Sequence, residues 1–344
     1  MLKNYKYVDY VHCRLHEFII AFFKRIEFET KPFDISFFES DFQEIVNRHR
    51  TILKNRFKQI YEKIQLWTQT QRSQFITQIV ESNDIENICN GAFTPLNVSQ
   101  IHPDIRVLVK DLFDDLYNQV LDGKPFKKEF NTNLRKHFEE FRDQNKEITL
   151  CPICGIGELK TKFDKTRDQY DHYLPISIYP LSSVNFKNLV PICKECNSLD
   201  VKAHKDIINL VSNGKLFYIY DTSHKGISIN LKIAKDDSKI ENIQWQINFS
   251  NPDGKIDEIK SWQVIYDIDN RYIGFITGRI EGWYKSYWQY KNSSILNFMN
   301  DSQKDISYFT SLEIDNENFL NFLRLPSLNT FITGSILLKA EIEM

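Results

Sequence analysis

The sequence predicts an α+β protein in which helices come first, a cysteine-bracketed segment lies in the middle, and strands mixed with helices come last. Apolar residues recur at steps of three and four up to about residue 146, which is the spacing of amphipathic helices. Four cysteines then form two Cys-x-x-Cys pairs, and later apolar residues alternate with polar ones, as in half-buried strands. We therefore expect a helical bundle over 1–146, a small metal-stapled module over 147–212 and an α+β domain over 213–344.

The first segment predicts several helices. Apolar residues from Phe42 to Ile64 follow one face of a single long helix. Further helices are expected over 75–88, with a break at Ser82-Asn83, and between Pro103 and Gly123. A last one is expected over 130–141. Short connections between helices favour antiparallel packing in a bundle.

The last segment predicts strands followed by helix. Residues 227–233, 243–249 and 262–268 alternate between apolar and polar, which indicates three strands. The sequence Asn-Pro-Asp-Gly at 251–254 predicts a turn between the last two of them. An aromatic-rich helix is expected over 271–288.

Composition restricts the class of protein. Of the 344 residues, 42% are apolar and 26% are charged, which is ordinary for a soluble globular protein. The net charge of −2 argues against a cationic coat over the whole surface, yet it allows a local basic groove. The apolar run at 18–23 is too short for a signal sequence or a membrane span. We expect a cytoplasmic protein that enters no membrane, since paired cysteines suit metal ligation in a reducing compartment.

The two Cys-x-x-Cys pairs predict a structural zinc site. Each pair presents two sulfurs from one turn, and two such turns complete a tetrahedron around Zn²⁺. All four ligands come from protein, so the site is closed and leaves no position for catalysis. A redox-active pair is the alternative, but neither pair lies between a predicted strand and a predicted helix. The four ligands are Cys151, Cys154, Cys193 and Cys196.

A second constellation lies between the cysteine pairs. The dipeptide Asp171-His172 stands in Tyr-Asp-His-Tyr-Leu-Pro, and the sequence Asn-Leu-Val-Pro-x-Cys-x-x-Cys-Asn runs from Asn188 to Asn197. In this combination the segment over about 148–206 resembles the HNH endonuclease family, the ββα-metal or His-Me finger nucleases, in its zinc-binding variant. The resemblance implies two strands and a helix that surround one catalytic divalent ion.

The resemblance also implies a role for each of four residues. His172 matches the general base that takes a proton from the attacking water, and Asn188 matches the residue that holds its imidazole. Asp171 and Asn197, the latter at the start of the helix, match the ligands of a catalytic Mg²⁺ or Mn²⁺. The chemistry agrees, because a neutral imidazole accepts protons near neutral pH and a hard ion on oxygen ligands polarises a phosphate.

Basic residues precede the Asp-His dipeptide. We hypothesise that they line one wall of a nucleic-acid groove, because phosphate contacts supply most non-specific affinity. The alternative is a solvated hairpin face, since acidic residues are interleaved with them. The four residues are Lys160, Lys162, Lys165 and Arg167.

A helix is expected over 200–211, directly after the second cysteine pair. It carries Lys202 and Lys205, which either contact a phosphate or are solvated. His204 falls outside the family pattern, and we expect an ordinary surface histidine.

The sequence therefore predicts a metal-dependent endonuclease that hydrolyses phosphodiester bonds in DNA. At the level of architecture, the resemblance implies anti-phage defence or a mobile element, with an ATPase or a sensor subunit as partner. Two alternatives stay open. One is an RNA-directed nuclease or toxin, and the other is a non-catalytic zinc module that binds nucleic acid or protein.

Overall fold

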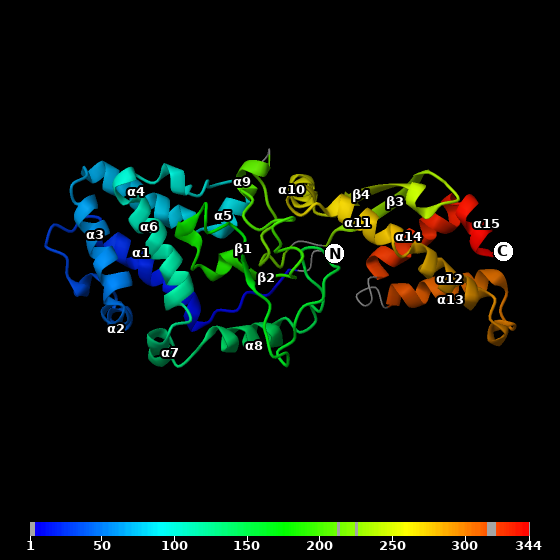
Figure 1. The fold of residues 1–344 in the computed structure, drawn as a ribbon, viewed down its shortest axis with the longest axis horizontal. Coiled ribbons are helices and arrows are strands. Elements are labelled where there is room, and N and C mark those ends of the chain that lie inside the picture. The colour runs from blue at the N-terminus through cyan, green and yellow to red at the C-terminus, as the bar shows by residue number, and fades with distance from the viewer. Residues whose placement is uncertain (1–3, 212–213, 224–225, 315–320, 344) are drawn as a thin grey trace. The chain divides into compact units, whose positions relative to one another are not determined.

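The computed structural model describes residues 4–211, 214–223, 226–314 and 321–343, and it combines helices with two small antiparallel sheets (Figure 1). The expected class of mixed helix and strand structure is confirmed at this level. The described chain forms two compact units, one built from residues up to 223 and one from the residues after it. Residues 154–156 group with the second unit. The expected helical segment and most of the expected finger thus belong to the same unit.

The first unit begins with helices whose apolar faces are turned inward. Pro103 opens α6 at its first turn, where the missing N–H costs nothing, and Asp84 caps α5 by accepting from the Asn87 amide. These helices are α1 (Arg14–Ile26), α2 (Ser40–Arg48), α3 (Asn55–Ile64), α4 (Gln69–Ser82), α5 (Ile85–Cys89), α6 (Pro103–Asp115), α7 (Lys124–Phe130) and α8 (Leu134–Gln144).

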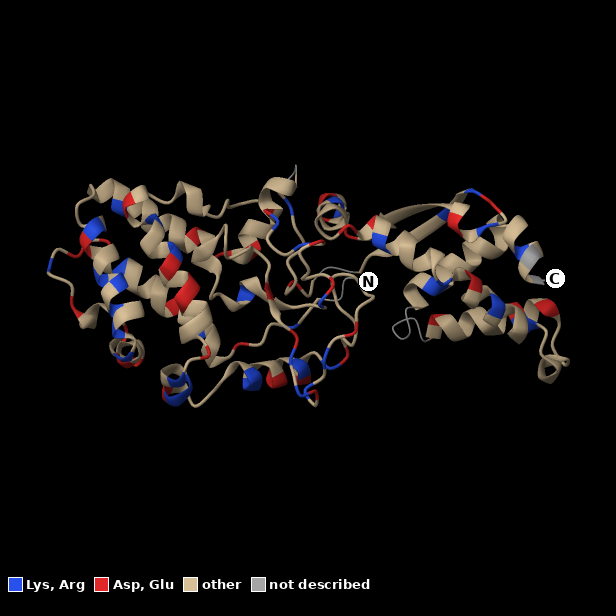
Figure 2. Ribbon diagram, viewed as in Figure 1, with Lys and Arg blue, Asp and Glu red and all other residues tan. Residues whose placement is uncertain are grey.

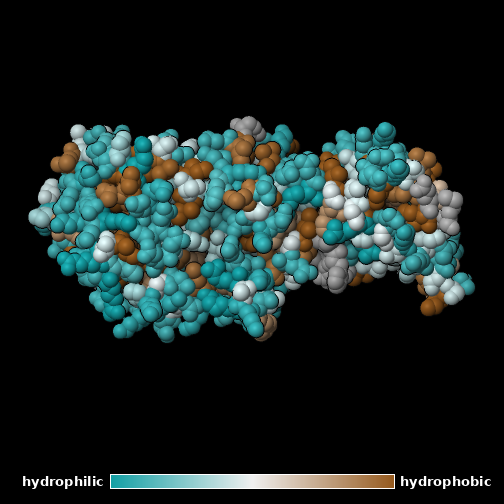
Figure 3. Space-filling model, viewed as in Figure 1, coloured by the Kyte–Doolittle hydropathy of each residue, from teal (hydrophilic) through white to brown (hydrophobic). Residues whose placement is uncertain are grey.

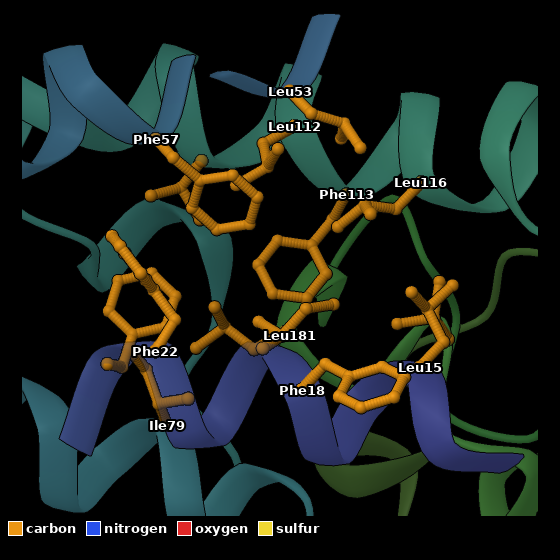
Figure 4. Close-up of a cluster of buried hydrophobic side chains, with 14 of the residues drawn as sticks. Leu15, Phe18, Phe22, Leu53, Phe57, Ile79, Leu112, Phe113, Leu116 and Leu181 are labelled. Atoms are coloured by element: carbon orange, nitrogen blue, oxygen red, sulfur yellow. The ribbon is translucent and has the colours of Figure 1, made fainter. Parts of the chain in front are cut away.

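The core of this unit is rich in phenylalanine. Phe18 and Phe22 of α1 lie below Phe57 of α3 and Phe113 of α6, and all four are buried (Figure 4). The rings meet by edge and by stacking, with Phe22 and Phe57 centroids 4.8 Å apart. Each buried ring contributes about 1.5–3 kcal/mol, so this cluster holds the helices together.

The long helix expected over 42–64 is interrupted. Its residues form α2 and α3, which are joined by a π-helical turn at Arg50–Lys54. His49, just before this turn, has φ −98° and ψ 49°, which is outside the helical region. Wider turns of this kind insert a residue into the helical ladder, and the apolar spacing alone does not reveal them.

Two short strands follow the helices. β1 (Tyr170–His172) pairs antiparallel with β2 (Leu189–Pro191), and Asp171 lies opposite Val190. Leu181, from the loop between the strands, joins the same hydrophobic cluster as the phenylalanines of α1 and α6 (Figure 4). The strand pair is therefore supported by the helical core.

The helix expected over 200–211 is wrong over most of its length. Residues 194–204 form turns and bends, and the helix α9 covers Ile207–Leu210 alone. Ala203 has φ +28°, in the left-handed region that an α-helix does not use. The finger helix that the resemblance implies, with Asn197 at its start, is accordingly not present in this form.

The second unit starts with a strand pair. β3 (Ser228–Lys235) pairs antiparallel with β4 (Gln244–Ser250), and both expected strands are confirmed. The helices that follow are α10 (Ile256–Tyr266), α11 (Ile268–Thr277), α12 (Ile280–Lys291), α13 (Asp301–Ile314), α14 (Asn321–Gly334) and α15 (Leu337–Glu343). The single helix expected over 271–288 is thus divided between α11 and α12.

The third expected strand, 262–268, is wrong, because its residues belong mainly to α10. Val264 is 56% exposed, whereas Ile259, Trp262 and Tyr266 are buried, so the apolar face has the helical period. The turn at 251–254 is present, but it leads from β4 into α10 rather than between two strands.

The surface carries mixed charge. Lys and Arg are interspersed with Asp and Glu along the helices (Figure 2). Hydrophilic residues predominate on the face shown in Figure 3, where apolar residues are scattered. Within the described ranges, no helix combines the length and the apolar character that crossing a membrane requires.

Candidate functional site

The four expected zinc ligands lie together. The sulfur atoms of Cys151, Cys154, Cys193 and Cys196 are all within 4.8 Å of one another, and all four side chains are buried. Cys151 Sγ and Cys196 Sγ are 4.0 Å apart. Zinc–sulfur bonds of about 2.3 Å in a tetrahedron place sulfurs about 3.8 Å apart, so these residues could hold a metal ion such as Zn²⁺.

Backbone groups support the cysteine cluster. The Cys193 amide donates to Cys151 Sγ at 3.5 Å, and the Ile156 amide donates to Cys154 Sγ at 3.4 Å. Gly157 is needed for this approach, because a Cβ at this position would lie 2.5 Å from Cys193 Cβ. Such amide–sulfur bonds stabilise thiolate ligands, which is the protonation state that zinc requires.

The Asp-His dipeptide lies at the wall of a cleft of about 510 Å³. β1 presents Asp171 and His172 to this cleft, and Asn197 reaches it from the turn after the second cysteine pair. We call it the cleft below. Three of the four residues that the resemblance singles out thus share one concave surface, although Asn197 lies 25 positions beyond His172 in the sequence.

The imidazole of His172 is held by a backbone carbonyl. Its Nε2 lies 3.0 Å from the Ser183 oxygen, and the Tyr117 ring contacts it edge-on with centroids 4.4 Å apart. A carbonyl oxygen only accepts, so Nε2 carries the proton and Nδ1 keeps its lone pair. Burial, aided by the charge of Lys202, lowers the pKa of His172 to about 3, so the ring is neutral at pH 7.

Asn188 is fully buried, and its side chain bonds to the backbone of the loop between β1 and β2 rather than to the imidazole. Its Oδ1 accepts from the Leu174 amide at 2.7 Å, and its Nδ2 donates to the Leu174 and Ser182 carbonyls at 3.1 and 3.2 Å. These bonds hold the two ends of the loop between β1 and β2. Since Ser183 follows directly, Asn188 positions the carbonyl that His172 binds, so its expected effect on the imidazole is indirect.

Asp171 is paired with a lysine that the sequence pattern places elsewhere. Lys202 Nζ lies 2.8 and 2.6 Å from the two carboxylate oxygens of Asp171 and 2.5 Å from the His172 carbonyl oxygen. The two side chains are 0% and 4% exposed. Burial raises the pKa of Asp171 and lowers that of Lys202, and the pair opposes both shifts. The expected solvated position of Lys202 is thus wrong, and its contact with a phosphate stays a prediction.

The other basic residues occupy several environments. Lys162 Nζ pairs with Asp143 at 2.6 Å, and Lys160 Nζ donates to Thr166 at 2.5 Å. Lys205 is half-buried, and its amide donates to the Lys202 carbonyl. None of these three belongs to the cleft lining.

Arg167 does line the cleft, where its guanidinium lies 5.0 Å from the Tyr170 ring centroid. Lys165 is exposed and lines a neighbouring hollow that also includes Arg167. Of the four expected groove residues, Arg167 therefore lines the cleft itself and Lys165 lines the hollow beside it.

The structure adds cleft residues that the motif analysis missed. Tyr117 and Asp114 reach the cleft from the helical segment, and His204 lines it from the turn after Lys202. In the sequence, Tyr117 is one of the apolar residues of a predicted helix, and nothing in its neighbourhood in the sequence indicates that it lines a cleft. His204 is exposed, as expected for a surface histidine, and it also lies close enough to lower the pKa of Asp171.

Comparisons with known proteins identify no family. No protein-family profile and no solved structure matches this chain. A curated protein named "Protein ea31", from Escherichia phage lambda, is 35% identical over 91 residues. The match covers 26% of this chain and 25% of that protein's length.

Proposed function

We propose that this protein is a metal-dependent HNH-type endonuclease that hydrolyses phosphodiester bonds in DNA at the cleft. The supporting observation is that Asp171, His172 and Asn197 line the same concave surface. The proposal assigns the proton transfer to His172, the binding of Mg²⁺ or Mn²⁺ to Asp171 and Asn197, and the positioning of the base to Asn188.

His172 has the protonation state that a general base needs. Its Nδ1 lone pair is free to accept a proton from water, because Nε2 donates to Ser183. A pKa of about 3 makes the free ring a weak base. A bound phosphodiester brings negative charge beside the ring and raises this pKa, so proton affinity increases when substrate is present. Arg167 provides a positive charge in the same cleft for a phosphate oxygen.

The side-chain oxygens of Asp171 and Asn197 are suitable ligands for a hard cation, but those of Asp171 are already bonded to Lys202. Carboxylate and amide oxygens are ligands for Mg²⁺ and Mn²⁺, and such an ion polarises a phosphate and stabilises the leaving oxygen. In this structure, however, Lys202 contacts both oxygens of Asp171. A cation on Asp171 therefore has to share this carboxylate with the ammonium or displace it. Among the described residues, a metal could be held by three or more His, Cys, Asp or Glu side chains at one place, the cluster of four cysteines.

The same ion pair favours a second candidate. If Lys202 neutralises Asp171 permanently, the unit is a non-catalytic zinc module that binds nucleic acid through its basic residues. RNA is the alternative substrate, because hydrolysis by water and a base needs no 2′-hydroxyl.

We further propose a setting in phage defence or in a mobile element, beside an ATPase or sensor subunit. The partial similarity to a phage lambda protein supports the mobile-element setting. The proposal of an ATPase or sensor subunit as partner is based on the resemblance to the HNH family.

Cleavage assays separate these candidates. The full chain is incubated with supercoiled plasmid and, in parallel, with a labelled RNA strand, in Mg²⁺ or Mn²⁺. We expect plasmid nicking that falls about 100-fold or more in His172→Ala, with zinc content and helical signal unchanged. His102→Ala, an exposed histidine of the same unit, is the control and keeps full activity. Undiminished nicking by His172→Ala rejects the proposal, and cleavage of RNA alone favours the alternative substrate.

A further inference from the structure

A second concave surface lies beside the cleft and gathers positive charge. It has a volume of about 540 Å³. Four basic side chains line it, Lys127, Arg135, Lys165 and Arg167, against one acidic side chain, Asp122. We call this surface the basic hollow. The chain as a whole carries a net charge of −2, so this local excess is not a consequence of composition.

The four cations come from three separate parts of the chain. Lys127 lies on α7 and Arg135 on α8, and both helices carry several basic residues (Figure 2). Lys165 and Arg167 belong to the segment that leads into β1. The hollow is therefore built jointly by two helices and by the segment before β1, so the sequence pattern of any one of them does not predict it.

Two of these cations, Lys127 and Arg135, form ion pairs at the surface. Lys127 Nζ lies 3.1 Å from Asp122, but the two side chains are 40% and 44% exposed. Arg135 Nε lies 2.7 Å from Glu139, also at the surface. Pairs of this exposure contribute about 0–1 kcal/mol, so a phosphate competes with them readily.

Arg135 adds a more specific feature. Its Nη2 donates to the Lys162 carbonyl, whereas its Nη1 is buried and has no hydrogen-bond partner among the described residues. The hollow also includes Asn133 and Leu134, at the start of the 11-residue helix α8. The positive end of the helix dipole therefore adds to the side-chain charges.

The hollow is continuous with the cleft, because Arg167 and Gln169 line both. We infer that the basic hollow binds the phosphates next to the bond that is cut, so that the substrate is a nucleic-acid strand that extends beyond the cleft. This inference rests on the proposed function for the position of the cut, whereas strand binding by the hollow does not depend on cleavage.

Two substrates of different size test the inference. Bis(p-nitrophenyl) phosphate is a small phosphodiester that needs the cleft alone, whereas an oligonucleotide of about twenty nucleotides also reaches the hollow. The test variant is Lys127→Ala/Arg135→Ala/Lys165→Ala in the full zinc-loaded chain. The matched control is Lys124→Ala/Lys128→Ala/Lys136→Ala, which removes the same charge from exposed residues outside the hollow lining.

Binding is measured in the His172→Ala background with DNA and RNA strands over a range of salt concentrations. We expect the test variant to bind strands about tenfold or more weakly, and to lower the slope of log affinity against log salt by about two to three. Oligonucleotide cleavage falls to the same extent, while bis(p-nitrophenyl) phosphate hydrolysis stays unchanged. The control variant keeps the binding, slope and cleavage of the parent.

The outcomes separate the two proposals. If test and control variants bind alike, strand binding is diffuse and the hollow is not a site. If the test variant loses bis(p-nitrophenyl) phosphate hydrolysis as well, the cations act in the cleft and the inference is wrong. If the parent hydrolyses neither substrate, the proposed nuclease function is wrong. If the test variant nevertheless binds strands more weakly than the parent and the control, the hollow remains a nucleic-acid binding site.

Discussion

Replacement of Lys202 by methionine removes the charge that faces Asp171 but keeps an unbranched apolar side chain in the same buried position. The ammonium donates to two carboxylate oxygens and one carbonyl oxygen, and the side chain is 0% exposed. Removal of one partner from such a pair costs about 3–5 kcal/mol, because the other charge stays buried without compensation. We expect a loss near the lower limit, about 3 kcal/mol at pH 7, since Asp171 can take up a proton.

The loss depends on pH in a defined direction. Burial already raises the pKa of Asp171 above 3.8, and without Lys202 the pKa rises further. A carboxyl group whose pKa is raised in the folded state prefers the protonated form there. Its cost is therefore absent below pH 3.8, grows as the pH rises from 3.8 to the folded-state pKa, and is constant above it. The deficit of Lys202→Met should shrink as the pH approaches 4.

Hydrogen exchange measured by mass spectrometry on peptides from α1 and α6 reports the stability of this unit by itself. The control is Asp171→Asn/Lys202→Met, which removes both charges. We expect the double variant to recover about 2 kcal/mol relative to the single variant. The reasoning is refuted if Lys202→Met stays within about 0.5 kcal/mol of the parent, or if the double variant is the less stable.

Three further predictions concern the metal site and pH. Cys196→Ser should abolish stoichiometric zinc in a metal analysis and lower the melting temperature, because structural zinc contributes directly to folding; retained zinc contradicts the site. Gly157→Ala should weaken zinc binding in a chelator competition and destabilise the unit by about 1–3 kcal/mol, because its Cβ meets Cys193; unchanged zinc affinity contradicts this geometry. Burial lowers the pKa of His137 from 6.5 to about 3, so its contribution to stability is present above pH 6.5 and declines by about 1.4 kcal/mol per pH unit as the pH falls toward 3. Burial lowers the pKa of His12, His16 and His172 as well, so denaturant melts of the parent from pH 7 to pH 4 should show a steeper total slope, and His137→Gln should reduce it by about 1.4 kcal/mol per pH unit.

Local patterns predicted what local interactions determine. The cluster of four cysteines could be predicted from the sequence, because each Cys-x-x-Cys turn presents its two sulfurs on the same side. The strands β3 and β4 were also predictable, because apolar and polar residues alternate over 227–233 and 243–249; the pairing register shifts only after Ile233. For the segment that became α10, both periods fit Trp262 and Tyr266, and only the exposure of Val264 decides between them.

Long-range contacts explain what the sequence did not reveal. The expected helix over 200–211 is good by propensity, but Lys202 reaches back to Asp171 and Ala203 adopts a left-handed conformation. The bonds of Lys202 depend on β1, because His172, whose carbonyl it binds, lies 30 residues earlier in the sequence. The motif therefore named Asp171 and His172 but not the ammonium that lies against them.

Chemical rescue tests the base role of His172 most directly. His172→Gly removes the imidazole beside Ser183, and free imidazole is then added to the zinc-loaded protein with Mg²⁺ or Mn²⁺. The account predicts that the variant cleaves DNA at least about 100-fold more slowly than the parent and that imidazole restores part of the rate. Full activity in the variant without added imidazole would contradict a proton transfer at this position.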